Sequence, residues 1–152
     1  MRLDLGGGLA PTPGHVNIDI VGSADIHWNL NKGLPRQKIF QMMKEGEVVE
    51  GIRALHVIEH LDSIIPLMNH CYEIMAPGSV LEISTPYAGT NQYWQDPTHK
   101  RGYVEESFLY FSKDSPYRKE QDEYGIYARF EIVSCSRGTG PDYWQLFVNL
   151  KR

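Results

Sequence analysis

The sequence predicts a single α/β domain over residues 1–152, with a mostly parallel sheet that closes in an antiparallel C-terminal hairpin. Strand-like apolar segments alternate with segments of helical periodicity along most of the chain, and two strand-like segments lie close together at its end. The 152 residues, 41% hydrophobic and 22% charged, suffice for one domain with its own core.

The first two predicted strands are joined by an unusually short connection. Residues 2–5 read as a buried strand ended by glycines 6–8, and residues 16–20 alternate apolar and polar side chains. The intervening segment 9–15 contains two prolines, whereas a parallel crossover normally takes a dozen or more residues and a helix. We therefore expect the helix after the first strand to be missing.

The next elements follow from apolar spacing. A weak third strand is expected over 24–28, a helix over 36–45, and a central strand over 52–57. One face of the 36–45 helix is expected to carry Ile39, Phe40 and Met43.

A second helix is expected to begin at Asp62 or Ser63, either of which could cap it, with Pro66 in its first turn. Its apolar residues recur at helical spacing and predict a buried face made of Ile64, Met68, Cys71, Tyr72 and Met75. Residues 76–78 stop this helix, and 79–84 form the next strand.

The C-terminal third contains a predicted helix, a loop and a hairpin. Residues 104–111 place Val104, Phe108 and Phe111 on one side of a helix. Residues 112–125 are rich in charge, Pro, Tyr and Gly and predict a mobile loop. Strands over 128–136 and 143–150 have the spacing of an antiparallel pair.

Charge, hydropathy and cysteine content argue against several classes of protein. A net charge of −4 and a pI near 5.8 give no clear nucleic-acid patch. No apolar run approaches the roughly 20 residues of a membrane helix, and no signal pattern opens the chain, so we expect a cytoplasmic protein. Cys71 and Cys135 are interpreted as small hydrophobic residues without a disulfide.

Glycines 6–8 and Asp19 suggest a nucleoside site. Glycines let a ligand approach backbone where a Cβ would collide, and Asp19, after the neighbouring strand, could accept hydrogen bonds from both ribose hydroxyls. A structural glycine turn is the alternative. A dinucleotide fingerprint fits poorly, because its third glycine would fall on Pro11 and Asp19 follows Gly8 too soon.

Six segments, in order, resemble motifs of the class I, Rossmann-like S-adenosylmethionine-dependent methyltransferases, in a short form with an abbreviated first connection. They are LDLGGG at 3–8, GHVNIDI at 14–20, DIHWNLNKGLP at 25–35, ALHVIEHL at 54–61, EIMAPGSVLEI at 73–83 and QDPTHKRGYVEESFLYF at 95–111. The resemblance implies a methyltransferase with S-adenosylmethionine as cofactor and S-adenosylhomocysteine as product.

The resemblance also implies cofactor contacts for particular residues. Gly6, Gly7 and Gly8 would line the methionine and ribose portion, Asp4 would orient the amino end, and Asp19 would hold the ribose hydroxyls. Asn29 and Leu30 would flank the adenine, although many relatives have an acid in place of Asn29. His56 and Val57 would face the methionine end.

The acceptor side is less defined. His99 is the candidate general base, because histidine titrates near neutral pH and this one follows the fifth strand, with Asp96 to orient it or bind acceptor hydroxyls. A turn and helix cap at 96–99 is the structural alternative. Tyr87 and Tyr93 could wall the pocket, and Lys100 and Arg101 could attract an anionic acceptor. Little chain remains for a lid, which favours a bulky acceptor such as a glycan, or a site that a second subunit of a homodimer completes. Small molecules and protein side chains stay open as acceptors, and O-methylation is expected over N- or C-methylation.

Two other functions compete. Residues 56–60 match the H-x-x-E-H signature of zinc hydrolases, with His56 and His60 as ligands and Glu59 activating water. The segment crosses a predicted strand end and helix start, which breaks the helical spacing that such a site needs, so we expect no metal ligands there. A non-catalytic nucleoside-binding or interaction module of the same fold is the other alternative.

Overall fold

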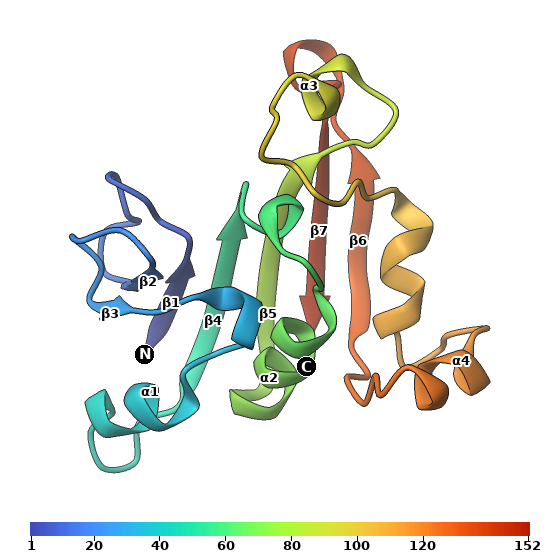
Figure 1. Ribbon diagram of the computed structural model, residues 1–152. Coiled ribbons are helices and arrows are strands. Elements are labelled where there is room, and N and C mark those ends of the chain that lie inside the picture. Colours follow the sequence, from blue (N-terminus) through green and yellow to red (C-terminus); the bar gives the residue numbers. More distant parts are fainter.

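Seven strands form one sheet in the order β3-β2-β1-β4-β5-β7-β6 in the computed structural model, which describes residues 1–152 (Figure 1). The strands are β1 (Arg2–Leu5), β2 (Val16–Asp19), β3 (Ile26–His27), β4 (Val49–Leu55), β5 (Met75–Pro86), β6 (Glu131–Arg137) and β7 (Gln145–Lys151). Strands β1 to β5 pair in parallel, and β7 lies antiparallel between β5 and β6. The predicted fold class is therefore confirmed.

Helices follow β3, β4, β5 and β6 but not β1 or β2. They are η1 (Leu30–Lys32), α1 (Arg36–Met42), η2 (Ile58–His60), α2 (Ile65–Ile74), α3 (Asn91–Trp94), η3 (Glu105–Phe111), α4 (Arg118–Glu123) and η4 (Gly140–Asp142). Crossovers between parallel strands are right-handed. The connections β1–β2 and β2–β3 run in one direction along the sheet, and the connections β3–β4 and β4–β5 run in the other. The two pairs of connections therefore pass over opposite faces of the sheet. The crossovers to β4 and β5 contain α1 and α2, whereas those to β2 and β3 are loops; Figure 1 shows α2 lying over one face of the sheet.

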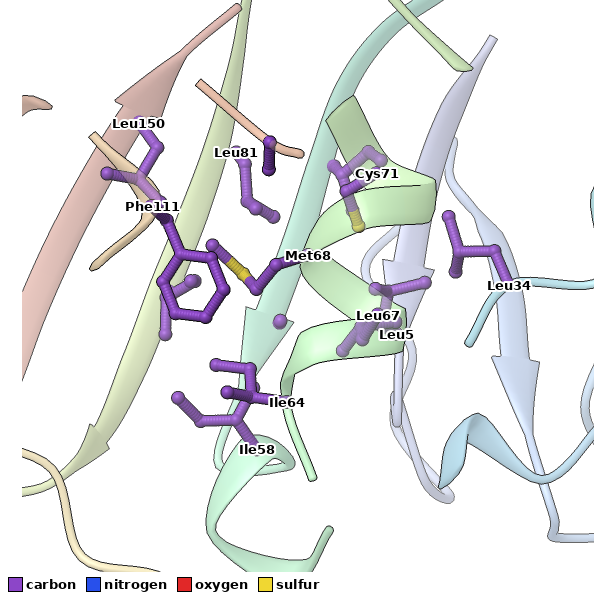
Figure 2. Close-up of a cluster of buried hydrophobic side chains, with 14 of the residues drawn as sticks. Leu5, Leu34, Ile58, Ile64, Leu67, Met68, Cys71, Leu81, Phe111 and Leu150 are labelled. Atoms are coloured by element: carbon purple, nitrogen blue, oxygen red, sulfur yellow. The ribbon is translucent and has the colours of Figure 1, made fainter. Parts of the chain in front are cut away.

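The core fills the helix-bearing face. Neighbouring strands align apolar residues in rows, of which Leu3, Ile52, Leu81 and Leu150 make one. Figure 2 shows Leu67, Met68 and Cys71 of α2 among the core side chains that lie over this face of the sheet. Met68 and Cys71 are buried, as the helical spacing predicts.

The opposite face of the sheet is polar. The row adjacent to the core row contains Asp4, Arg53, Glu82 and Asn149 in register across four strands. Arg53 Nε donates to Glu82 Oε2 at 2.9 Å, and Arg53 also donates to the Thr12 hydroxyl at 3.1 Å. Alternation of apolar and polar residues lets water replace the helices that normally cover both faces of a parallel sheet.

The short first connection lacks its helix, as predicted. It is held to the polar face by the buried Asp4, whose Oδ2 accepts the Thr12 backbone N–H at 2.6 Å, and by the bond from Arg53 to Thr12. Two side chains of the sheet thus fix the backbone of the glycine loop.

Several predicted bounds need correction. The 36–45 helix ends at Met42, and Phe40 is exposed. The 52–57 strand is Val49–Leu55 instead, because His56 adopts a left-handed backbone conformation that ends it. The helix expected to begin at Asp62 or Ser63 has Ile64 at its N-cap position. The strand expected over 79–84 begins at Met75, which pairs with Val49.

The C-terminal bounds also differ. The 104–111 helix is the 3₁₀ helix Glu105–Phe111, and the final strands are Glu131–Arg137 and Gln145–Lys151. No helix is both long and apolar enough to cross a membrane.

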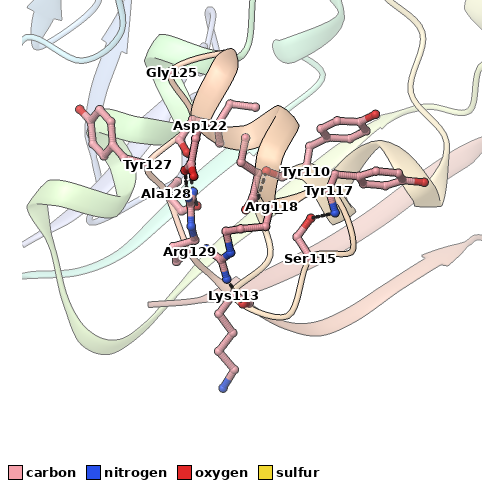
Figure 3. A network of polar contacts seen from close by, with 12 residues as sticks. Tyr110, Lys113, Ser115, Tyr117, Arg118, Asp122, Gly125, Tyr127, Ala128 and Arg129 are labelled. Atoms are coloured by element: carbon pink, nitrogen blue, oxygen red, sulfur yellow. Dashed lines mark hydrogen bonds and ion pairs between the residues drawn. The ribbon is translucent and has the colours of Figure 1, made fainter.

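The predicted mobile loop at 112–125 instead contains α4 and a dense set of polar contacts (Figure 3). Arg129 donates a hydrogen bond to the Asp122 carboxylate at 3.0 Å, and Arg118 donates one to the Lys113 carbonyl at 2.7 Å. The rings of Tyr110 and Tyr117 stack with their centroids 4.3 Å apart. The buried Gln121 donates to the carbonyls of Tyr110 and Ser112. These contacts, which pattern analysis does not detect, order the segment.

Candidate functional site

A cleft of about 330 Å³ opens at the carboxyl ends of β1, β2 and β4. It is lined by Gly6, Asp19, Ile20, Trp28, Asn29, Leu30, Asn31, His56, Val57, His60 and Leu61. The chain steps from β1 to one side for β2 and β3, then returns to the other side for β4. The cleft therefore lies where the strand order reverses, which is where open α/β sheets bind ligands.

Asp19, the last residue of β2, is held in place by three backbone N–H groups. Its Oδ2 accepts from Gly8 at 2.8 Å, and its Oδ1 accepts from Ile20 at 2.5 Å and Val21 at 3.3 Å. Each carboxylate oxygen has two acceptor sites, so Oδ2 keeps one for a hydroxyl donor. The acid thus both closes the glycine loop and lines the cleft.

The three glycines serve different purposes. Gly6 has φ +68°, and a Cβ there would lie 2.6 Å from Val57 Cγ2. A Cβ on Gly7 would lie 2.7 Å from Asn17 Oδ1, which accepts the Gly7 N–H. Gly8, at φ +58°, has no atom within 4 Å of the Cβ position. Close packing inside the protein therefore requires glycine at positions 6 and 7, whereas a side chain at position 8 would meet no protein atom. Of the three glycines, only Gly6 lines the cleft.

The opposite wall comes from the segment after β3. Asn29 Oδ1 caps η1 by accepting the Asn31 N–H, and Leu30 is buried, while Trp28 Nε1 donates to the Gly33 carbonyl. Ile20, which is 63% exposed, adds a further apolar surface. Sequence reasoning missed Ile20, Trp28, Asn31, His60 and Leu61 as lining residues; their nearness to Asp19, Asn29 and Val57 in the chain was the available signal.

The chemistry of this lining fits a nucleoside. Apolar side chains from two walls suit a flat base, and the carboxylate with one spare acceptor site suits a ribose hydroxyl. Asp4, by contrast, lies beneath the loop, where its hydrogen bond to Thr12 holds the backbone.

His56 closes the β4 end of the cleft in a strained conformation. It is the only residue other than glycine with positive φ, at 54°. Its Nε2 lies 3.1 Å from Gln145 Oε1 and its Nδ1 3.5 Å from Glu59 Oε1, and the ring stacks on Trp144. The hydrogen bond to Glu59 raises the pKa of His56 against the opposing effect of burial.

The H-x-x-E-H segment is not on one helix. His56 follows β4, whereas Glu59 and His60 belong to the 3₁₀ helix η2. The zinc-hydrolase geometry, with both histidines on one helical face, is therefore absent.

His99 lies in the loop after β5 and packs against His60. Its ring is 4.9 Å from that of His60 and stacks on Tyr93, whose carbonyl accepts from His99 Nδ1 at 2.7 Å. Asp96 Oδ1 accepts from both the backbone and the hydroxyl of Thr98, which lowers the Asp96 pKa. His99 and Asp96 therefore border the cleft through His60, without lining it.

The remaining acceptor-side residues are engaged in contacts within the chain. Tyr93 is buried, and Tyr87 lies 4.6 Å from the Arg137 guanidinium. Lys100 pairs with the Asp62 carboxylate at 2.8 Å, and Arg101 donates to the Asp62 carbonyl.

Comparison with known proteins supports the fold. No family model matches the chain, and no curated protein matches it by sequence. Among solved structures, 99% of the chain superposes on 85% of an S-adenosylmethionine-dependent methyltransferase from Archaeoglobus fulgidus, at 15% identity and a TM-score of 0.60. It likewise superposes on 76% of the N-methyltransferase NodS of Bradyrhizobium japonicum in complex with S-adenosylhomocysteine, at 13% identity and 0.56. A third such methyltransferase, from Mesorhizobium loti, matches over 90% of its length at 12% identity and 0.58. The chain thus has the class I methyltransferase fold.

Proposed function

We propose that the protein is an S-adenosylmethionine-dependent methyltransferase. The observation that carries the proposal is the cleft at the strand-order reversal, where the Asp19 carboxylate faces apolar walls beside the glycine loop. Complexes of two proteins with this fold, NodS and a methyltransferase from Burkholderia thailandensis, contain S-adenosylhomocysteine. Fold and cleft chemistry agree with the motifs read from the sequence.

Different residues of the cleft would bind different parts of the cofactor. Asp19 would accept a hydrogen bond from a ribose hydroxyl at Oδ2. Trp28 and Leu30 would pack on the adenine with Asn29 beside it, and Gly6, His56 and Val57 would contact the methionine end. Bound S-adenosylmethionine supplies an activated methyl group for in-line displacement. The protein then has to align the acceptor and exclude water.

We further propose an oxygen acceptor on a small molecule or glycan. Such a hydroxyl must lose a proton, and His99 is the candidate base. Because its Nδ1 donates to the Tyr93 carbonyl, the neutral ring keeps an unprotonated Nε2, which is the nitrogen that accepts a proton. Asp96 acts indirectly, by fixing Thr98 beside His60.

Calorimetry with S-adenosylhomocysteine tests the binding site. The wild-type protein should bind in the micromolar range, and Asp19→Asn should bind at least about tenfold more weakly, since a charged hydrogen-bond acceptor contributes about 1.5–3 kcal/mol. Asp114→Asn, an exposed acid outside the cleft, is the matched control. Absence of binding to the wild type at millimolar ligand would refute the proposal.

Turnover distinguishes an enzyme from a binding module. Methyl transfer from labelled cofactor to a library of hydroxylated acceptors should be detectable for the wild type. His99→Ala should keep cofactor affinity and slow transfer; an unchanged rate would remove His99 as the base. Binding without transfer to any acceptor would favour the non-catalytic module.

A further inference from the structure

We propose that Glu59, His60 and His99 form a binding site for one divalent transition-metal ion at the edge of the cleft. Single ligand atoms of these three residues lie within 4.8 Å of one another. Ligands of tetrahedral Zn²⁺ at 2.0–2.2 Å are about 3.4 Å apart, so side-chain movements of about 1 Å complete the site. His99 is distant from the other two in sequence, and only the loop after β5 brings it there.

Both imidazoles keep one unprotonated nitrogen that could bind a cation. A carbonyl can only accept, so His99 Nδ1 carries its proton toward the Tyr93 carbonyl. The Thr98 hydroxyl gives its one hydrogen to Asp96 Oδ1 at 2.7 Å, so it accepts from His60 Nδ1 at 3.0 Å. Each ring therefore leaves Nε2 as the free lone pair. Metal-binding histidines are fixed in this way, by a carbonyl or a polar side chain on the other nitrogen.

The carboxylate of Glu59 is buried and has two side-chain partners. It is 1% exposed, accepts from the Thr85 hydroxyl at 3.0 Å, and forms one ion pair, with His56 at 3.5 Å. The nearby Lys100 and Arg101 side chains are turned to Asp62. A cation bound at the carboxylate would add a second positive partner to this buried group.

The ligand set selects the class of ion. Two imidazole nitrogens and one carboxylate suit Zn²⁺, Fe²⁺, Mn²⁺ or Co²⁺, whereas Mg²⁺ and Ca²⁺ prefer oxygen ligands alone. Asp96 Oδ2, 3.7 Å from His99 Nε2, is a further oxygen beside the site. Three protein ligands leave a coordination position open.

The open position suggests a role that rests on the proposed function. His60 also lines the cleft, so the ion would lie between the cofactor pocket and the loop after β5. An acceptor hydroxyl bound there would be oriented, and its pKa lowered as that of metal-bound water is. His99 would then hold the cation through Nε2 in place of acting as the base, and the proton of the cation-bound hydroxyl would pass to solvent.

Metal binding can be tested without cofactor. Protein stripped with EDTA is titrated with Zn²⁺ or Mn²⁺, and bound metal is counted after gel filtration. We expect one ion per chain for the wild type and for His27→Gln, an exposed histidine outside the cluster. We expect at least tenfold weaker binding for His60→Gln and His99→Gln, with circular dichroism showing that both are folded. Thr98→Val, which keeps every ligand, should lose about 10–100-fold through ring misorientation.

Two results would overturn the inference: no binding of either metal to the folded wild type, or equal affinity in the His60 and His99 variants. Calorimetry with S-adenosylhomocysteine on the stripped protein separates this from the proposed function. Cofactor binding without metal binding refutes only the cation site, whereas metal binding without cofactor binding refutes only the methyltransferase.

Discussion

Replacing Gly6 and Gly8 by alanine compares two glycines of similar backbone conformation and different surroundings. Their φ angles are +68° and +58°, so each alanine incurs the cost of the left-handed region, about 1–2 kcal/mol. Only the Cβ at position 6 overlaps protein atoms, at 2.6 Å from Val57 Cγ2 and 2.8 Å from Val57 Cβ. Overpacking of this kind adds about 1–3 kcal/mol.

Thermal unfolding followed by circular dichroism measures the difference. The excess cost of about 2 kcal/mol for Gly6→Ala corresponds to a melting temperature about 6 °C below that of Gly8→Ala, at about 3 °C per kcal/mol for a domain of this size. Each alanine also restricts the unfolded chain by a similar amount, so this effect cancels in the difference between the two melting temperatures. Equal melting temperatures would refute the assignment of Gly6 to a close contact with Val57.

Two further predictions concern titratable groups away from the cleft. Burial and the charge of Arg36 lower the pKa of His70, whose Nδ1 accepts the Leu34 N–H, so its NMR titration should give a pKa below about 6.5. As the pH falls below 6.5, His70 is protonated in the unfolded chain before it is protonated in the folded protein. The stability that His70 contributes is therefore present above pH 6.5 and is lost as the pH falls through the lowered pKa. The His70→Gln variant should lack this loss, and a measured pKa at or above 6.5 would contradict the reasoning. Burial raises the pKa of the Cys71 thiol strongly, and that of half-buried Cys135 to about 11, so a disulfide reagent at pH 8 should label both thiols rapidly only in urea. Rapid labelling of Cys71 in the folded protein would show that α2 opens readily.

The order and type of the main elements could be predicted because local pattern reports burial. Residues 2–5 and 16–20 have strand patterns, and the segment between them is too short and too proline-rich for a helix. The local pattern predicts a later start for the strand after α2, since Met75 belongs to that strand only through pairing with Val49. The composition of 112–125 predicts a loop, because α4 is short and polar; the segment is ordered instead by contacts of Gln121 with Tyr110 and Ser112, which the local pattern does not report.

The sequence by itself determined the order and type of the main strands and helices, that the first crossover has no helix, and that the second strand carries an acid near its end, beside a glycine loop. These properties depend on hydrophobic periodicity and chain length, which are local. Only the tertiary structure decided that Gly6 and Gly7 serve internal packing, that one sheet face is polar and free of helices, and that His99 meets Glu59 and His60. Such contacts join residues from different elements, and their distances depend on strand order, crossover handedness and side-chain packing.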